Sequence, residues 1–134
     1  MHLTTPLLLA SLAFFGTVLA RRGCGKTHWT TQDVRYLEPG QGACSYYTDS
    51  TLGVCMNPTC VNNKNRCGRT LWVATPDGSL NVTDVQVVDK CGGVFDCDSL
   101  WVTKSLFTSL NGDFGSGHID QLQWGFQCDD DDDN

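Results

Sequence analysis

The chain has 134 residues, with 9 Lys or Arg against 15 Asp or Glu, and a formal net charge of −6. Five of the acidic residues form the run Asp129–Asp133, so the rest of the chain is close to neutral and carries no basic stripe. This pattern argues against nucleic-acid binding, which depends on clustered Lys and Arg. We expect residues 129–134 to be a disordered acidic tail, because like charges repel and the run has no apolar side chain. A weak calcium site there is the less favoured alternative.

The N-terminal segment has the pattern of a secretion signal. Residues 2–20 contain no Lys, Arg, Asp or Glu, Leu7–Phe15 is an apolar core, and Val18–Ala20 ends in a small residue. We therefore predict a signal peptide at residues 1–20 and a secreted, extracellular protein. The apolar run is too short for a membrane span, which needs about 20 residues. The pair Arg21–Arg22 is either a second processing site or two exposed charges.

Eight cysteines follow the predicted signal: Cys24, Cys44, Cys55, Cys60, Cys67, Cys91, Cys97 and Cys128. An even number in a short secreted chain is typical of a disulfide framework. Zinc is the alternative, because Cys55 and Cys60 reach the widest spacing of a zinc knuckle. The oxidising compartment favours four disulfides, and the spacing alone does not choose the pairing. We treat residues 21–128 as one disulfide-stapled domain.

The first predicted elements are short strands separated by loops. Thr48–Arg66 is interpreted as a loop held by Cys55, Cys60 and the adjoining Cys67. Arg69–Ala74 is rich in strand formers, Thr75–Gly78 is a Pro- and Gly-containing turn, and Val82–Asp89 is the returning strand of a hairpin. Asn81 begins an Asn-Val-Thr sequon, which predicts N-glycosylation.

One helix is predicted, at Thr103–Leu110, with Thr103 as its N-cap and Asn111-Gly112 as its end. Its buried face consists of Leu106, Phe107 and Leu110. The last element is a strand, because Leu122, Trp124 and Phe126 alternate with glutamines.

The order of the segments resembles that of secreted double-psi β-barrel proteins: expansin first domains, barwin-like proteins and small fungal loosenin-like proteins. Its matching segments are Asp33–Tyr36, Gly40–Cys44, Cys67–Arg69, Val85–Cys91, Leu100–Leu110 and Gly117–Phe126. The resemblance implies a mainly β fold: a small six-stranded double-psi β-barrel with one or two short helices, stapled by disulfides.

The resemblance also implies a ligand-binding groove, with Asp89 on its floor. Its predicted lining is Arg35, Tyr36, Asp89, Lys90, Asp98 and Trp101. Asp89 is the candidate catalytic residue; the alternative is that its carboxylate bonds the backbone of Gly92 and Gly93. Trp101 stands where expansin-like domains carry a second Asp, and the His-Phe-Asp motif of related hydrolases is absent. Because glycoside hydrolysis normally needs two carboxylates, we do not expect an enzyme.

Aromatic side chains are the other candidates for sugar binding, because their faces stack on pyranose rings. The candidates are Tyr36, Tyr46, Tyr47, Trp72 and Trp101, whereas Trp124 and Phe126 are interpreted as core. His28 and His118 are interpreted as isolated surface residues. There is no phosphate loop and no recognisable metal motif, so neither a cofactor nor a metal is expected.

Three functions follow from the resemblance. The first is a non-lytic, loosenin-like monomer that binds and loosens cell-wall glucan, cellulose or chitin. The second is a secreted effector or cysteine-protease inhibitor that binds a host or competitor protein, which a projecting loop at Thr48–Arg66 would favour. The third is a weak glycan-cleaving enzyme, which a second carboxylate within about 5–9 Å of Asp89 would favour.

Overall fold

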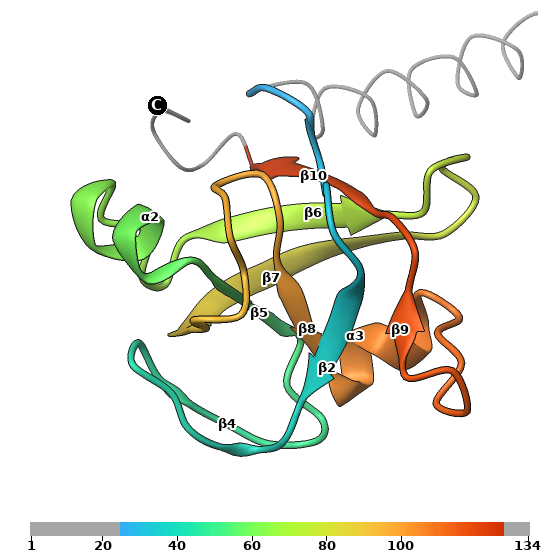
Figure 1. Ribbon diagram of the computed structural model, residues 1–134, viewed down its shortest axis with the longest axis horizontal. Helices are drawn as coiled ribbons and strands as arrows, with labels where there is room; N and C mark the ends of the chain where they lie inside the picture. Colours follow the sequence, from blue (N-terminus) through green and yellow to red (C-terminus); the bar gives the residue numbers. More distant parts are fainter. Residues whose placement is uncertain (1–24, 128–134) are drawn as a thin grey trace, which may run out of the picture.

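The computed structural model describes residues 25–127 (Figure 1). The predicted signal peptide and acidic tail lie outside the described residues, as do Cys24 and Cys128. Among the described residues, no helix combines the length and the apolar character that crossing a membrane requires.

Residues 25–127 form ten strands and two short helices. The strands are β1 (His28–Trp29), β2 (Val34–Leu37), β3 (Gly40–Gln41), β4 (Tyr46–Tyr47), β5 (Gly53–Met56), β6 (Thr70–Ala74), β7 (Asn81–Lys90), β8 (Trp101–Thr103), β9 (His118–Ile119) and β10 (Gln123–Phe126); the helices are α2 (Pro58–Asn63) and α3 (Lys104–Ser109). Eight strands form one sheet in the order β1-β10-β6-β7-β5-β8-β2-β9, and β3 pairs with β4. The six strands longer than two residues, namely β2, β5, β6, β7, β8 and β10, match the predicted number.

The sheet curls because short connections join its two ends. β1 lies at one edge and leads through residues 30–33 into β2, which is next to the opposite edge. β9 lies at that opposite edge and leads through residues 120–122 into β10, beside β1. Since a few residues span only a short distance, these strands must lie close in space. The β2–β8 and β5–β7 pairs are parallel and the others antiparallel. The predicted mainly β barrel is confirmed (Figure 1).

The inside of the curled sheet is an aliphatic and aromatic core. It contains Val54, Leu71, Val102, Phe107 and Trp124, all fully buried. Burying each such side chain stabilises the fold by about 1.5–3 kcal/mol. Phe126 is buried too, so the last strand and its predicted apolar face are confirmed, but Gln127 is also buried, and the predicted polar face is not fully exposed.

The predicted hairpin is confirmed as β6 and β7, an antiparallel pair with a bulge between Leu71 and Val73. Gly78 has φ +76° in the connecting turn, and its N–H donates to Thr75 O at 2.9 Å. Such a φ is costly for any residue with a Cβ, which explains why glycine stands there.

The predicted helix is confirmed as α3, and its predicted end at Asn111-Gly112 is confirmed as well. Asn111 has φ +61°, its N–H donates to Thr108 O, and the Gly112 N–H donates to Phe107 O. This pair of bonds is a Schellman motif. The predicted capping role of the Thr103 side chain is wrong, because its hydroxyl donates to Thr51 O at 2.6 Å and accepts from Gly53 N at 3.1 Å.

The predicted loop at Thr48–Arg66 is wrong, because the segment contains β5 and α2. β5 is buried at all four positions in the middle of the sheet. α2 begins at Pro58 with Asn57 as N-cap, whose side chain accepts from Thr59 N at 2.9 Å. The segment is therefore not one continuous loop: β5 lies within the sheet, and α2 lies at its side, tied by the Cys60–Cys97 disulfide (Figure 1).

Six of the eight cysteines form three disulfides: Cys44–Cys67, Cys55–Cys91 and Cys60–Cys97. No cysteine among the described residues is free. Cys55 and Cys60 bond to different partners, so the structure contradicts the zinc alternative for this pair. The disulfide prediction is confirmed for these six residues.

Candidate functional site

A row of side chains crosses the outer face of the sheet. We call it the outer row; its members are Asp89 on β7, Cys55 on β5, Trp101 on β8, Arg35 on β2 and His118 on β9. Cys55 is the register partner of both Asp89 and Trp101, and Arg35 is the partner of His118. Tyr36 pairs with Val102 in parallel strands, so the preceding residues of both strands continue the row. At about 4.8 Å between strands, the row extends about 19 Å.

The same register separates Tyr36 from the outer row. Adjacent strand residues point to opposite faces. The Tyr36 ring accordingly lies 5.1 Å from Phe107 and 4.9 Å from Phe114, on the core side of β2. Arg35, the next residue back, is exposed. The structure thus brings Arg35 into one row with Asp89 and Trp101, and places Tyr36 away from them.

The Asp89 carboxylate accepts hydrogen bonds at both oxygens. Oδ1 accepts from the backbone N–H groups of Ala43 and Lys90, each at 2.8 Å, and Oδ2 accepts from the Tyr47 hydroxyl at 3.1 Å. The alternative that Asp89 bonds backbone amides is supported, but with Ala43 and Lys90 in place of Gly92 and Gly93. These bonds join β7 to the β3–β4 hairpin, and they fix the orientation of the carboxylate.

Tyr47 shows how enclosed this side of Asp89 is. Its side chain is 6% exposed. Burial raises the pKa of the Tyr47 phenol, and the hydrogen bond to Asp89 and the negative charge of that carboxylate raise it further. Sequence analysis did not pair these two residues, and their separation of 42 residues left no local signal.

Trp101 is half-buried beside the Cys55–Cys91 disulfide. It packs, together with Leu37, against the small cluster of Cys55, Cys91 and Val94. Gly93 lies against the end of the indole, where a Cβ would come within 2.2 Å of the ring. The indole N–H is buried with no hydrogen-bond partner among the described residues. The Trp101 indole is therefore held between Gly93 and the cluster of Cys55, Cys91 and Val94, and it is only partly exposed to solvent.

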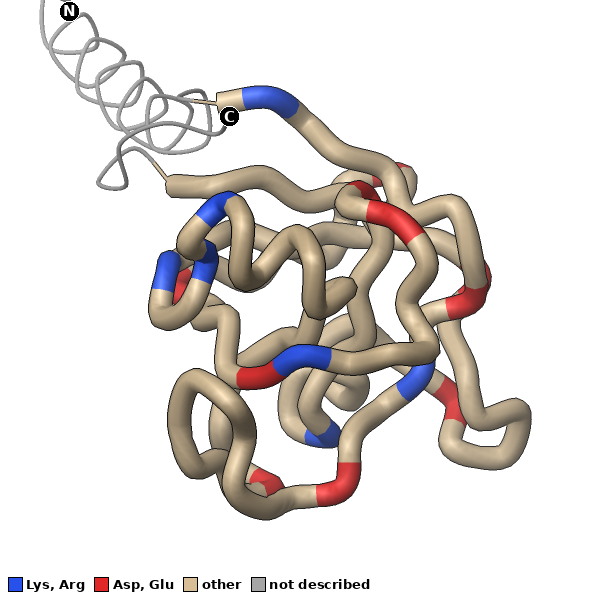
Figure 2. The backbone as a smooth tube through the Cα atoms, turned by 60° about the vertical axis from the view of Figure 1, so that its left-hand side comes forward, with Lys and Arg blue, Asp and Glu red and all other residues tan. Residues whose placement is uncertain are grey.

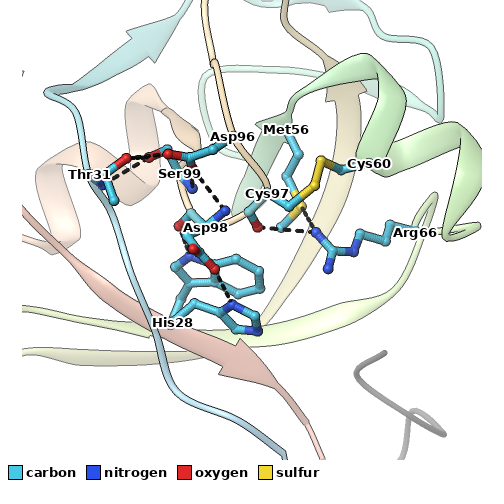
Figure 3. Close-up of polar contacts among 10 residues, drawn as sticks. His28, Thr31, Met56, Cys60, Arg66, Asp96, Cys97, Asp98 and Ser99 are labelled. Carbon is cyan, nitrogen blue, oxygen red and sulfur yellow. Dashed lines mark hydrogen bonds and ion pairs between the residues drawn. A yellow bond between two sulfur atoms is a disulfide. The ribbon is translucent and has the colours of Figure 1, made fainter.

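Asp98 lies at a different part of the barrel. Its Oδ1 is 2.8 Å from His28 Nδ1, and its backbone O accepts from Trp124 Nε1 (Figure 3). The His28 ring stacks on Trp124 with centroids 4.2 Å apart. The interpretation of His28 as an isolated residue is therefore wrong. Neither β1 nor the loop that contains Asp98 contributes a residue to the outer row, so this pair is outside it.

The other predicted site residues have mixed environments. Lys90 is half-buried at the end of β7, where it is the register partner of the buried Met56. Trp72 is only 3% exposed and belongs to the core, so its role as a sugar platform is contradicted. Tyr46, at 65% exposed, is the open aromatic of the β3–β4 hairpin. Lys, Arg, Asp and Glu are interspersed over the described chain (Figure 2).

Comparison with known proteins gives structural matches but no sequence matches. No protein-family model matches the chain, and no curated protein matches it. Ligand-free expansin from Clavibacter michiganensis is 24% identical with a TM-score of 0.59, over 81% of this chain and 53% of that chain. A mutant of that expansin in complex with cellohexaose is 24% identical with a TM-score of 0.60, over 81% and 54%.

A third match is Streptomyces papain inhibitor, at 22% identity and a TM-score of 0.55, over 78% of this chain and 94% of that chain. The fold is therefore the double-psi β-barrel seen in expansin-like and barwin-like proteins. The chain spans about half the length of the expansin structures that it matches.

Proposed function

We propose that the protein is a secreted, non-lytic, cell-wall polysaccharide-binding protein that loosens the contacts between chains. One observation carries this proposal: the register places Trp101, Arg35 and Asp89 in one row across the outer face of an expansin-like barrel. An indole face stacks on a sugar ring, while guanidinium and carboxylate groups bond its hydroxyls. A row extending about 19 Å suits an extended glycan better than a single sugar.

Three features support binding without cleavage. Asp89 accepts three hydrogen bonds, which occupy both of its oxygens and fix its orientation. Two strands further along the row, beyond Cys55, stands Trp101, whose indole cannot act as an acid or a base. Asp98, the other predicted carboxylate, faces His28.

The test is a depletion isotherm on insoluble cellulose, chitin and β-1,3-glucan. Trp101→Ala should weaken binding about tenfold, equivalent to about 1.4 kcal/mol of stacking energy. Trp29→Ala is the matched control, because Trp29 is 43% exposed on β1, outside the outer row. Equal losses for both variants, or no loss for Trp101→Ala, would contradict the proposed face.

Trp101 also packs on the Cys55–Cys91 cluster, so its removal affects stability as well. Binding is therefore expressed per folded molecule, and Arg35→Ala serves as a second variant because Arg35 is exposed. A reducing-sugar assay on the same supernatants checks for cleavage. Release of sugar by the wild type that Asp89→Asn abolishes would replace the non-lytic proposal with the enzymatic one.

A protein-binding role is the second candidate, supported by the match over 94% of the papain inhibitor chain. The predicted loop at Thr48–Arg66 gives it less support, since β5 lies within the sheet and only the part with α2 lies at the side of the barrel (Figure 1). Titration of papain with the purified protein separates the candidates. Stoichiometric inhibition, together with no binding to any of the three polymers, would place the inhibitor role first.

A further inference from the structure

One His and two Asp side chains converge at the edge formed by β2 and β9. His118 Nε2 lies 3.0 Å from Asp120 Oδ1 and 3.8 Å from Asp33 Oδ2. All three donor atoms lie within 4.8 Å of one another. The side chains of His118, Asp33 and Asp120 are 33%, 56% and 93% exposed, so an ion in solution reaches them. We call these three residues the edge cluster.

Strand register brings the edge cluster together. Val34 pairs with Ile119 and Arg35 with His118 in an antiparallel ladder (Figure 1). Asp33 and Asp120 lie one residue beyond the ends of this ladder, and their carboxylate oxygens lie within 4.8 Å of each other. Like charges directly opposite one another destabilise a sheet. A cation between the two carboxylates would remove that repulsion.

The surroundings of His118 leave Nε2 as the nitrogen that faces the carboxylates. Nδ1 lies 3.3 Å from the carbonyl oxygen of Ser116, and Nε2 lies 3.0 Å from Asp120 Oδ1. In the tautomer with the proton on Nδ1, the Nε2 lone pair points toward the carboxylates, which is the direction that a bound metal ion would occupy.

A metal ion accounts for more of this geometry than a proton does. A proton on Nε2 would point at one carboxylate only, whereas a metal ion could bind all three residues. Tetrahedral coordination at about 2.0–2.2 Å puts ligand atoms about 3.3–3.6 Å apart. The separations of 3.0 and 3.8 Å to Nε2 would then change by a few tenths of an ångström. The two carboxylate oxygens, which lie within 4.8 Å of each other, would approach by up to about 1.5 Å. An imidazole nitrogen favours zinc-like ions over calcium or magnesium.

We propose that the edge cluster is a binding site for Zn²⁺ or a similar divalent transition-metal ion, with His118, Asp33 and Asp120 as ligands and water completing the coordination. The nearest charged side chain in the ladder is Arg35, opposite His118. Within the described chain neither carboxylate is ion-paired with Arg35, so both remain available to the metal. Backbone contacts with Asp113 hold the other side of His118.

Calorimetric titration of the metal-stripped full chain with Zn²⁺ at neutral pH tests the proposal. His118→Gln removes the imidazole without changing the carboxylates, and it should weaken Zn²⁺ binding at least about tenfold, because even the loss of a group that only supports a ligand typically costs about 10–100-fold. Asp120→Asn should weaken it too, and this residue is too exposed for folding to depend on it. Asp77→Asn is the control, because it removes one exposed carboxylate from a distant turn. The acidic tail is present in every variant, so its cation binding is common to all.

Nitrogen NMR of the His118 ring is the second measurement. One equivalent of Zn²⁺ should shift the Nε2 resonance, and Ca²⁺ should not. Equal Zn²⁺ affinities for the wild type and His118→Gln, or an Nε2 signal that responds to protons and not to Zn²⁺, would overturn the metal site. Neither measurement involves a polysaccharide, so its outcome is independent of the proposed function.

Discussion

The two faces of the curled sheet are held together by different forces. On the inner face, Val54 and Val102 are register partners within the apolar core cluster. On the outer face, the next pair is Cys55 and Trp101, beside a disulfide and in the same row as Asp89. The inner face is stabilised mainly by burial, whereas the outer face depends on a disulfide and on hydrogen bonds from distant segments. We therefore expect changes inside to cost stability, and changes outside to cost both stability and binding.

The largest effect is expected from Phe107→Ala on the inner face. Phe107 is fully buried and contacts the rings of Tyr36 and Phe114. Its truncation should lower the free energy of unfolding by about 3–5 kcal/mol, through lost burial and a cavity. Phe95→Ala is the control: this side chain is 79% exposed, and a change within about 0.5 kcal/mol is expected. Urea denaturation gives both values, and equal values would show that the inner face is not the main source of stability.

The next effect is expected from removing the disulfide of the outer face. Replacing Cys55 and Cys91 by Ala opens a link between residues separated by 36 positions. The free energy of unfolding, measured without reductant, should fall by about 2–4 kcal/mol.

The disulfide framework as a whole has its own test. Thiol titration of the denatured, unreduced wild type should find no free thiol among the eight cysteines. Two or more free thiols would contradict a fully oxidised chain.

A smaller effect is expected at Asp89, and here the two substitutions differ. Asp89→Ala leaves the amides of Ala43 and Lys90 and the Tyr47 hydroxyl without their acceptor, at a cost of about 1–3 kcal/mol. Asp89→Asn keeps one acceptor oxygen, so the cost should be at most about 1 kcal/mol. If the charge serves binding, both variants lose polysaccharide affinity per folded molecule. Unchanged affinity in Asp89→Asn would make Asp89 a structural residue.

The smallest effect is expected on the pKa of the Tyr47 phenol and on the stability that depends on it. Burial, the hydrogen bond to Asp89 and the charge of Asp89 raise the Tyr47 pKa above its ordinary value of 10.0. Since the folded pKa is the higher one, this stabilisation is complete below pH 10 and is lost as the pH rises through the raised pKa. Asp89→Asn should move the Tyr47 pKa back toward 10.0 but not fully, because burial remains. Ultraviolet titration against Tyr47→Phe measures this change, and an unchanged pKa in Asp89→Asn would contradict the pairing.

Local patterns in the sequence predicted the inner face well. Alternation in residues 122–126, the helical spacing of Leu106, Phe107 and Leu110, and the turn at Thr75–Gly78 each reflect which side chains enter the core or which φ angle the backbone takes. These constraints act over a few residues, so the sequence displays them directly.

The same reasoning failed at β5, because a four-residue strand buried on both faces has no alternation to detect. The start of α2 was detectable, since an Asn before a Pro is a typical helix N-terminus. The outer face was less predictable. The Asp89 partner Ala43 is 46 residues away, and the edge cluster joins Asp33 to residues at the opposite end of the domain. Only the tertiary pairing of strands brings such groups together.

Two of the disulfides connect the same pair of segments, with a consequence for the protein's resistance to proteolysis. Cys55–Cys91 and Cys60–Cys97 both bridge across the β6–β7 hairpin, whose exposed turn at Asp77–Ser79 is the kind of tip that proteases cut. A single cut there leaves the two fragments doubly cross-linked and still hydrogen-bonded within one sheet. The nicked molecule would migrate as one species until it is reduced, so cleavage at this tip would not release the two halves of the barrel from one another.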